Sequence, residues 1–264
     1  MPSPGKRGRD MKQKSQSVMR FLTGSAVPIL FITISVIAIP LSNYSGLYLA
    51  REIVTRLCRD SFLVLSLLIP VMAGMGINFG MTLGAMAGQI GLIFITDWGI
   101  NGAFGLFMAA LIGTPIAILL GYFGGIVLNR AKGREMITSM MLSYFVSGIY
   151  QFFMLYLCGN IIPIKSPKLL LSRGYGIRNA ITLNVAGGFD KLIRIPIGKV
   201  YVPFGTILLI AAACIFIMWF RRTKLGQDMR AVGQDMGVAD ASGIKVEKTR
   251  IESIIISTVL ACYG

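Results

Sequence analysis

Two long stretches without a charged side chain, residues 61–96 and 98–129, are the strongest constraint on how this chain can fold. Of its 264 residues, 55% are hydrophobic and 14% are charged, whereas a soluble domain carries about 25% charged residues. A soluble protein would need an unusually large core to bury such stretches, but a lipid bilayer accepts them. The sequence therefore predicts a polytopic integral membrane protein.

Apolar segments close to the length of about 20 residues that crosses a hydrocarbon core recur along the chain. They occupy residues 21–39, a segment from Ser61, and residues 81–95, 103–128, 136–157 and 202–220. A seventh begins at Ser253, but residues 253–264 would reach only about 18 Å into a core of about 30 Å. We therefore expect an all-α fold, a polytopic transmembrane helical bundle of six full spans plus the start of a seventh, in a chain that is truncated.

The two segments nearest the amino terminus need separate interpretation. Residues 21–39 follow a basic tail, as in a signal peptide, but the apolar run is long and no A-x-A-like cleavage site follows it. We interpret it as an uncleaved first span. Residues 41–60 interleave apolar and charged side chains at helical spacing, which predicts an amphipathic helix at the membrane interface.

The basic residues, which give a net charge of +15, gather in the connections between apolar segments. The tail 1–20, the connection 130–134 and the segment 221–250 hold six, three and seven Lys and Arg, together 16 of the chain's 26. Since such clusters mark the cytoplasmic side, we expect a cytoplasmic amino terminus and tail, a cytoplasmic loop at 221–252, and an extracytoplasmic loop at 159–202 with short strands or a small cap. Nucleic-acid binding would need one contiguous basic face, so membrane lipid is the expected partner and nucleic acid is not.

A run of glycines at every fourth position opens the third apolar segment. The glycines are Gly76, Gly80, Gly84 and Gly88. On one helix they would lie on one side and let a neighbouring backbone approach closely. The alternative is a glycine-rich break in a span, which is tolerated beside a cavity or within protein and often forms a substrate site in transporters. In that case the translocation path would use the nearby polar residues Asn78, Thr82 and Gln89.

The sequence offers little catalytic chemistry. It contains no histidine, no GxSxG motif and no GxxxxGK[ST] phosphate loop. Acidic residues, which mark proton and ion relays inside membranes, are absent from the predicted spans, and Asp97 falls at an interface turn beside Trp98. We therefore expect no catalytic residue, metal or cofactor, and any energy for transport would have to come from another subunit.

The polar segment 221–251 lies between two apolar runs and is helical in period. Its glycines, Gly233, Gly237 and Gly243, predict two short helices with a turn between them, and its charges alternate in sign. Alternating charge suits a surface that pairs with another protein. A solvated loop with ordinary surface charges is the alternative.

Three short strings in this segment carry a family resemblance: Thr223-Lys-Leu-Gly226, Arg230-Ala-Val-Gly233 and Ala239-x-x-Ser242-Gly243-Ile244. They resemble the cytoplasmic coupling loop of permease subunits of bacterial ABC importers of the branched-chain amino acid and ribose/simple-sugar type. The final residues 260–264 are similar to the apolar motif that opens that family's next span. Residues 76–80, with Gly84, are similar to its glycine-rich early segment. The resemblance covers about residue 61 to the end.

The resemblance implies a transport subunit of the bacterial plasma (inner) membrane, with residues 21–264 as its transmembrane permease domain. Its partners would be a second permease, cytoplasmic ABC ATPase subunits and an extracytoplasmic solute-binding protein. The ATPase would act on the 221–252 loop, which the following residues would shape: Thr223, Gly226, Arg230, Gly233, Ala239 and Gly243. The solute would be small and polar, a sugar or nucleoside before a branched-chain amino acid. The alternatives are a membrane scaffold or enzyme without a motor partner, and a truncated non-functional remnant.

Overall fold

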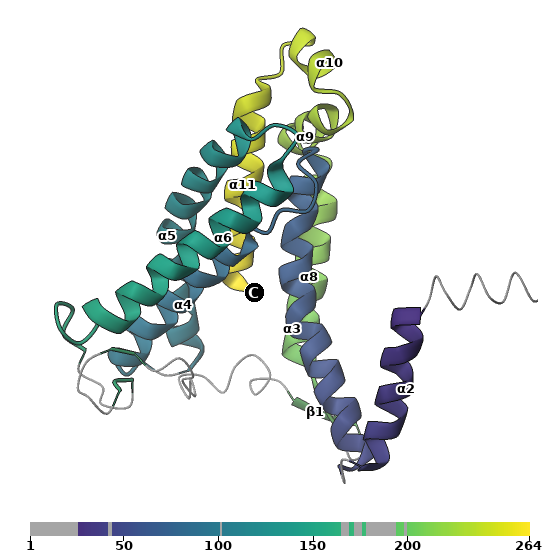
Figure 1. Cartoon of the computed structure of the whole chain (residues 1–264), viewed down its shortest axis with the longest axis vertical. Coiled ribbons are helices and arrows are strands. Elements are labelled where there is room, and N and C mark those ends of the chain that lie inside the picture. Colours follow the sequence, from purple (N-terminus) through teal and green to yellow (C-terminus); the bar gives the residue numbers. More distant parts are fainter. Residues whose placement is uncertain are drawn as a thin grey trace, which may run out of the picture. The chain divides into compact units, whose positions relative to one another are not determined.

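The computed structural model describes residues 26–41, 44–100, 102–164, 169–171, 176–177, 194–197 and 200–264, and helices dominate them (Figure 1). The predicted tail 1–20 and most of the predicted loop 159–202 lie outside the described residues. The elements are α2 (Ala26–Leu41), α3 (Gly46–Met72), α4 (Met81–Asp97), α5 (Ala103–Arg130), α6 (Glu135–Phe152), η1 (Phe153–Leu157), β1 (Arg194–Ile197), β2 (Val200–Pro203), α8 (Phe204–Phe220), α9 (Lys224–Gln234), α10 (Met236–Ala241) and α11 (Val246–Tyr263).

The chain divides into two compact units, Met1–Ile53 and Val54–Gly264. The first contains α2 and the start of α3. The predicted interfacial helix at 41–60 and the span from Ser61 are not separate, because α3 continues from Gly46 to Met72. No glycine or proline interrupts this junction, and the Ser61 hydroxyl donates to the Leu57 carbonyl oxygen over 2.5 Å within the same helix.

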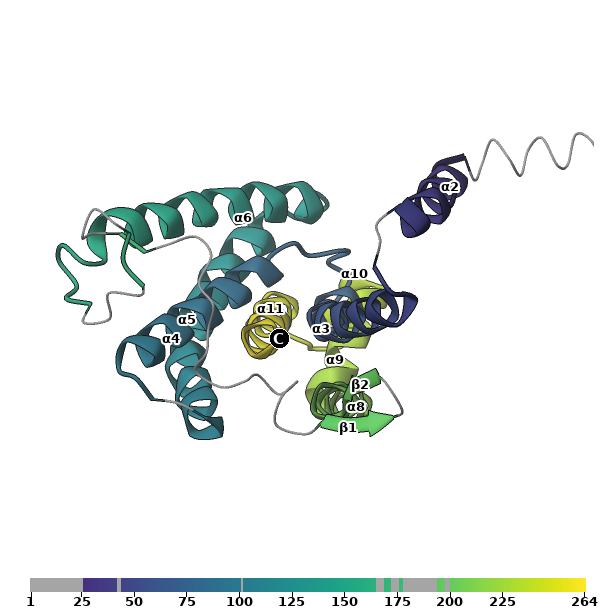
Figure 2. The same cartoon turned by 90° about the horizontal axis from the view of Figure 1, so that it is seen from below.

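Within the second unit, α11 packs against both α4 and α5 (Figure 2). Glycines make this approach possible, because a side chain there would meet the backbone of α11. A Cβ on Gly88 of α4 would lie 2.6 Å from the Cys262 carbonyl oxygen, and one on Gly84 would overlap that of Thr258. On α5, a Cβ on Gly121 would overlap the Thr258 hydroxyl. Small residues at helix contacts are how membrane helices gain close van der Waals packing.

More than half of the buried residues of α11 are polar. Its buried polar residues are Thr249, Arg250, Ser253, Ser257 and Thr258. The hydroxyls find backbone acceptors: Ser257 donates to the Ser66 carbonyl oxygen of α3 over 2.8 Å, and Thr258 lies 3.0 Å from the Ile254 carbonyl oxygen. Buried polar groups require such partners. Helix α11, which was predicted as an incomplete seventh span, therefore contacts α3, α4 and α5.

Two described helices, Phe104–Arg130 and Glu135–Leu157, are long and apolar enough to cross a membrane. Shorter apolar helices occupy Leu30–Leu41, Asp60–Met72, Met81–Asp97 and Ile207–Phe220. Large apolar side chains such as Leu119 stay exposed, 69% in that case, as expected of surfaces that face lipid. The fold is that of a helical membrane protein, and the count of six full spans stays a prediction.

A small β-hairpin is added to the helices. Strands β1 and β2 pair antiparallel, with Arg194 opposite Pro203 and Ile197 opposite Val200. They lie at the end of the predicted 159–202 loop, immediately before α8. The expectation of short strands there is confirmed. The fold is therefore helical with one small β-hairpin, rather than all-α.

Candidate functional site

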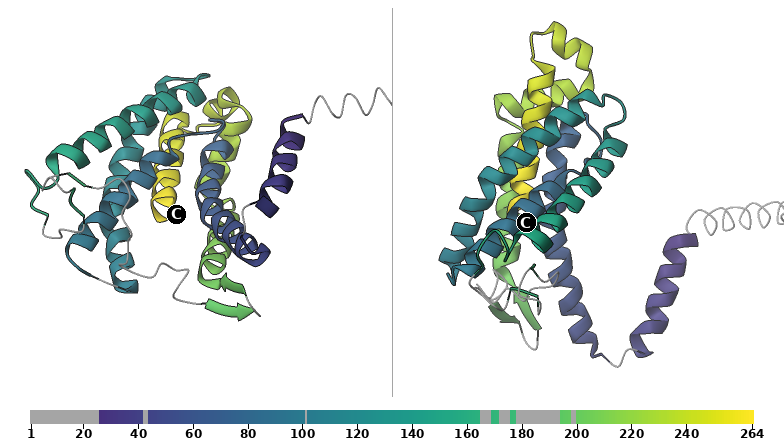
Figure 3. Two further views of the ribbon diagram at one scale, coloured as in Figure 1. Left: turned by 60° about the horizontal axis from the view of Figure 1, so that its bottom comes forward. Right: turned by 60° about the vertical axis from the view of Figure 1, so that its left-hand side comes forward.

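The 221–252 loop is folded. It forms α9, then α10, then a turn into α11, which confirms the prediction of two short helices (Figure 3). Local capping explains where they begin. The Thr223 hydroxyl oxygen accepts from the Gly226 amide over 3.3 Å, and Asp235 Oδ1 accepts from the Gly237 and Val238 amides over 2.7 and 3.1 Å. Such N-caps satisfy amides that a helix leaves unpaired at its start.

A small apolar core holds the loop together. Val232 of α9, Ala239 of α10 and Val246 of α11 are buried against one another, with Ala231 and Ile244 packed beside them. The turn that closes this core passes through Gly243, whose φ of +83° favours glycine. The loop is therefore an ordered unit with its own core. The alternative interpretation, a solvated loop with ordinary surface charges, does not account for this core.

The six predicted loop residues have different surroundings. Thr223 caps α9, Gly243 makes the turn, and the buried Ala239 belongs to the small core. Gly226 is also buried, and a Cβ there would overlap the carbonyl oxygen of Phe220 at the end of α8. Arg230 is exposed on α9.

Gly233, the sixth of these residues, contacts the connection between α3 and α4, which we call the 73–80 break. A Cβ on Gly233 would overlap the Met72 carbonyl oxygen and lie 3.1 Å from the Gly74 amide nitrogen. Reciprocally, a Cβ on Gly74, where φ is +74°, would lie 2.9 Å from the Gly233 Cα. The two backbones touch because both positions are glycine.

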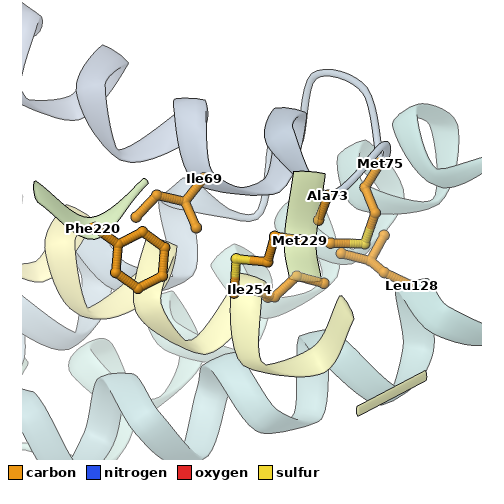
Figure 4. Packing of buried hydrophobic residues seen from close by; sticks show 7 residues of the cluster. All are labelled: Ile69, Ala73, Met75, Leu128, Phe220, Met229 and Ile254. Atoms are coloured by element: carbon orange, nitrogen blue, oxygen red, sulfur yellow. The ribbon is translucent and has the colours of Figure 1, made fainter. Parts of the chain in front are cut away.

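An apolar cluster extends this contact (Figure 4). Met229 of α9 is fully buried beside Ala73 and Met75 of the break. The remaining buried members of the cluster are Ile69, Leu128, Phe220 and Ile254. The loop and the 73–80 break therefore share one core.

The four spaced glycines do not lie on one helix. Helix α4 begins at Met81, so Gly84 and Gly88 are helical and face α11, as the packing interpretation predicts. The interpretation is wrong for Gly76 and Gly80, which lie in the non-helical break. Gly76 adopts a φ of +64°, which a right-handed helix does not contain. The alternative interpretation, a glycine-rich break, describes these two positions.

The three predicted path residues are spread over the break and α4. Asn78 is 2% exposed; its Oδ1 accepts from the Gly80 amide over 2.8 Å, while its buried Nδ2 has no hydrogen-bond partner among the described residues. Thr82 Oγ1 lies 3.1 Å from the Phe79 carbonyl oxygen. Gln89 is exposed further along α4.

Two serines of α6, which the sequence interpretation missed, hold the 73–80 break on its other side. The Phe79 amide donates to Ser139 Oγ over 3.2 Å, and Ser143 Oγ donates to the Phe79 carbonyl oxygen over 2.7 Å. Thr82 Oγ1 lies 2.9 Å from the same Ser143 oxygen. The non-helical backbone at Phe79 is thus paired within protein, as a membrane setting requires.

An ion pair at the base of the loop was also missed. Arg250 is fully buried, and its Nη2 lies 2.5 Å from Oε1 of Glu135, the first residue of α6, which is 12% exposed. Its Nη1 lies 3.1 Å from the Met236 sulfur of α10. The prediction that treated Arg250 as one of the surface charges is wrong, because three helices converge on it.

Cavities adjoin both ends of α11. One, of about 1000 Å³, opens beside the loop and is lined in part by Tyr122, Met236 and Lys248. Another, of about 740 Å³, is mainly apolar and includes Gly88, Phe107 and Phe216. Within the described residues, no group of three His, Cys, Asp or Glu side chains is placed to hold a metal ion.

Together these features define a helical membrane protein with a folded polar loop joined to a broken helix connection. A family model described as "Branched-chain amino acid transport system / permease component" matches residues 52–263. The chain belongs to this family, which confirms the resemblance drawn from the loop strings.

Among curated proteins, the chain is similar to the "Nucleoside ABC transporter permease protein NupB" of Lactococcus lactis subsp. cremoris (strain MG1363). The two are 24% identical over 157 residues, which is 60% of this chain and 41% of the relative. The aligned part thus spans less than half the length of that relative. No solved structure matches the chain with significance.

Proposed function

We propose that the chain is the permease subunit of an ATP-driven ABC importer for a small polar solute. The observation that carries this proposal is the folded 221–252 loop, whose Gly233 touches the 73–80 break at Gly74. A loop that is ordered outside the membrane and joined to a break within it gives a motor protein a place to act. The relative's name favours a nucleoside, with a sugar as the other main candidate.

The proposed arrangement follows the charge distribution. The amino terminus and the 221–252 loop face the cytoplasm, and residues 159–202 face the opposite side, where a solute-binding protein delivers the solute. A second permease subunit and two cytoplasmic ATPases complete the importer. In this arrangement six spans cross the inner membrane, and a seventh span begins after the 221–252 loop.

The exposed side of α10, together with Arg230 on α9, is the proposed ATPase-docking surface. Val238 of α10 is 64% exposed and Met236 is 36% exposed, and the exposed Asp235 and Asp240 flank them in the sequence. Arg230 is exposed on the neighbouring helix. An apolar side chain surrounded by polar groups is the usual composition of an interface centre. The other predicted loop residues shape this surface from within.

The translocation path is proposed to pass the 73–80 break. Asn78 supports this, because its buried Nδ2 is a hydrogen-bond donor without a partner among the described residues. Leaving such a group unpaired costs about 1–3 kcal/mol, and a hydroxyl or carbonyl oxygen of a polar solute would remove that cost. Thr82 and Gln89 are proposed to follow along α4.

Replacing Val238 with glutamate is expected to weaken binding of the partner ATPase at least about tenfold, because a buried interface contact becomes an unpaired charge. Co-purification of the full chain with the ATPase encoded nearest to it measures this. Lys224→Glu, an exposed charge change at the start of α9, is the matched control and should leave association unchanged. Equal association for Val238→Glu and the parent, with both chains monodisperse, would contradict the docking surface.

A further inference from the structure

The 73–80 break is held from two sides, by α9 and by α6. The α9 side is the glycine contact at Gly233. On the α6 side, Ser139 and Ser143 bond to the amide and carbonyl of Phe79. The position of Asn78, next to Phe79, thus depends on α6 as well as on the loop.

The same face of α6 also reaches the base of the 221–252 loop. Glu135, Ser139 and Ser143 are spaced by four residues, so they lie one above the other on the helix surface. Glu135 pairs with the fully buried Arg250, and Arg250 contacts Met236 at the start of α10. One stripe of three side chains therefore joins Arg250 at one end to Phe79 at the other.

We propose that this stripe is a second mechanical connection between the 221–252 loop and the 73–80 break, and that Arg250 is a positioning residue for Asn78. A displacement of α10 is carried by Arg250 to Glu135 and moves α6, and Ser139 and Ser143 move the Phe79 backbone with it. Such buried, hydrogen-bonded contacts transmit displacement because they cannot stretch without losing partners. The inference deepens the proposed function, but its test needs neither ATPase nor solute.

The test is the reactivity of a cysteine placed in the break of the full chain in liposomes. Ile77 precedes Asn78 and is 52% exposed, so Ile77→Cys, in a chain whose native cysteines are replaced by alanine, reports on the break. The measured quantity is the rate of labelling by N-ethylmaleimide. Arg250→Gln and Ser143→Ala are each expected to raise it at least about twofold, because either variant removes a contact that fixes the backbone beside residue 77.

The decisive result is the double variant. Arg250 contacts Glu135 at one end of the stripe, and Ser143 forms the other end. Glu135 and Ser143 are about 12 Å apart along α6, at 1.5 Å per residue. The free-energy effects of two substitutions at that distance normally add. If the stripe is one connection, Arg250→Gln with Ser143→Ala labels no faster than the faster single variant. Multiplied rates, or a rate for Arg250→Gln equal to the parent's, would overturn the proposal.

Two further variants separate this role from simple loss of folding. Lys248→Gln removes an exposed pair with Glu252 on the same helix and should leave the labelling rate unchanged. Exchanging the charges, Glu135→Arg with Arg250→Glu, should return the rate to within about twofold of the parent, since the pair is restored. An exchange variant that is monodisperse but still labels as fast as Arg250→Gln would also overturn the proposal.

Discussion

Gly233→Ala is expected to separate α9 from the 73–80 break and to destabilise the chain by about 3 kcal/mol. The added methyl would overlap the Met72 carbonyl oxygen, and a backbone atom cannot rotate away as a side chain can. Overpacking of this kind costs about 1–3 kcal/mol, and more where the neighbours cannot shift. Unfolding of the purified chain in detergent, followed by tryptophan fluorescence, measures the change.

The control for this substitution lies in the same loop. A Cβ on Gly237 would meet only its own capping oxygen, Asp235 Oδ1, at 3.3 Å. Gly237→Ala should therefore change stability by less than about 1 kcal/mol. If both alanine variants unfold like the parent, the contact between the loop and the break does not contribute to the fold as described.

Arg250→Met is the substitution with the next largest expected effect, a loss of about 3 kcal/mol. Removing one partner of a buried ion pair leaves the other charge uncompensated, which costs about 3–5 kcal/mol. The lower end applies because Glu135 keeps 12% of its side chain exposed. The same detergent unfolding experiment measures it.

Two comparisons identify the cause. Lys248→Met breaks a pair whose side chains are 71% and 33% exposed, and such pairs contribute at most about 1 kcal/mol. Adding Glu135→Gln to Arg250→Met should recover more than half of the loss, because the stranded carboxylate becomes neutral. Without that recovery, the loss would come from packing of the arginine side chain rather than from its charge.

The loop was predictable from the sequence because its structure is specified locally. Thr223 and Asp235 cap helices that begin within three residues of them, and Gly243 marks the turn by its own conformation. Apolar residues at helical spacing then supply Val232 and Ala239 to the small core. Each signal lies within the segment that it organises.

The glycine run shows the limit of a periodic pattern. A spacing of four is compatible with a helix, and Gly84 and Gly88 obey it. Whether the helix extends back to Gly76 depends on contacts that the spacing does not encode. The break is held by Gly233 and by Ser143, residues far away in the sequence.

The Arg250–Glu135 pair was hidden for a similar reason. In the sequence, Arg250 closes a run of alternating charges that suits a surface, and Glu135 lies 115 positions earlier among basic residues. Arg250 is buried where α11 meets α6 and α10, through its contacts with Glu135 and Met236. The sequence interpretation did not use the spacing of four between Glu135, Ser139 and Ser143, and that spacing alone does not show which residues they contact.

The central claim is that a motor acting on the 221–252 loop moves the 73–80 break. The most direct measurement is the N-ethylmaleimide labelling rate of Ile77→Cys in liposomes containing the chain with its partner ATPase, with and without ATP. We expect ATP to change the rate at least about threefold in the parent and to leave it unchanged when Val238→Glu prevents docking. A rate that ATP leaves unaltered in an assembled, hydrolysing complex would contradict the claim.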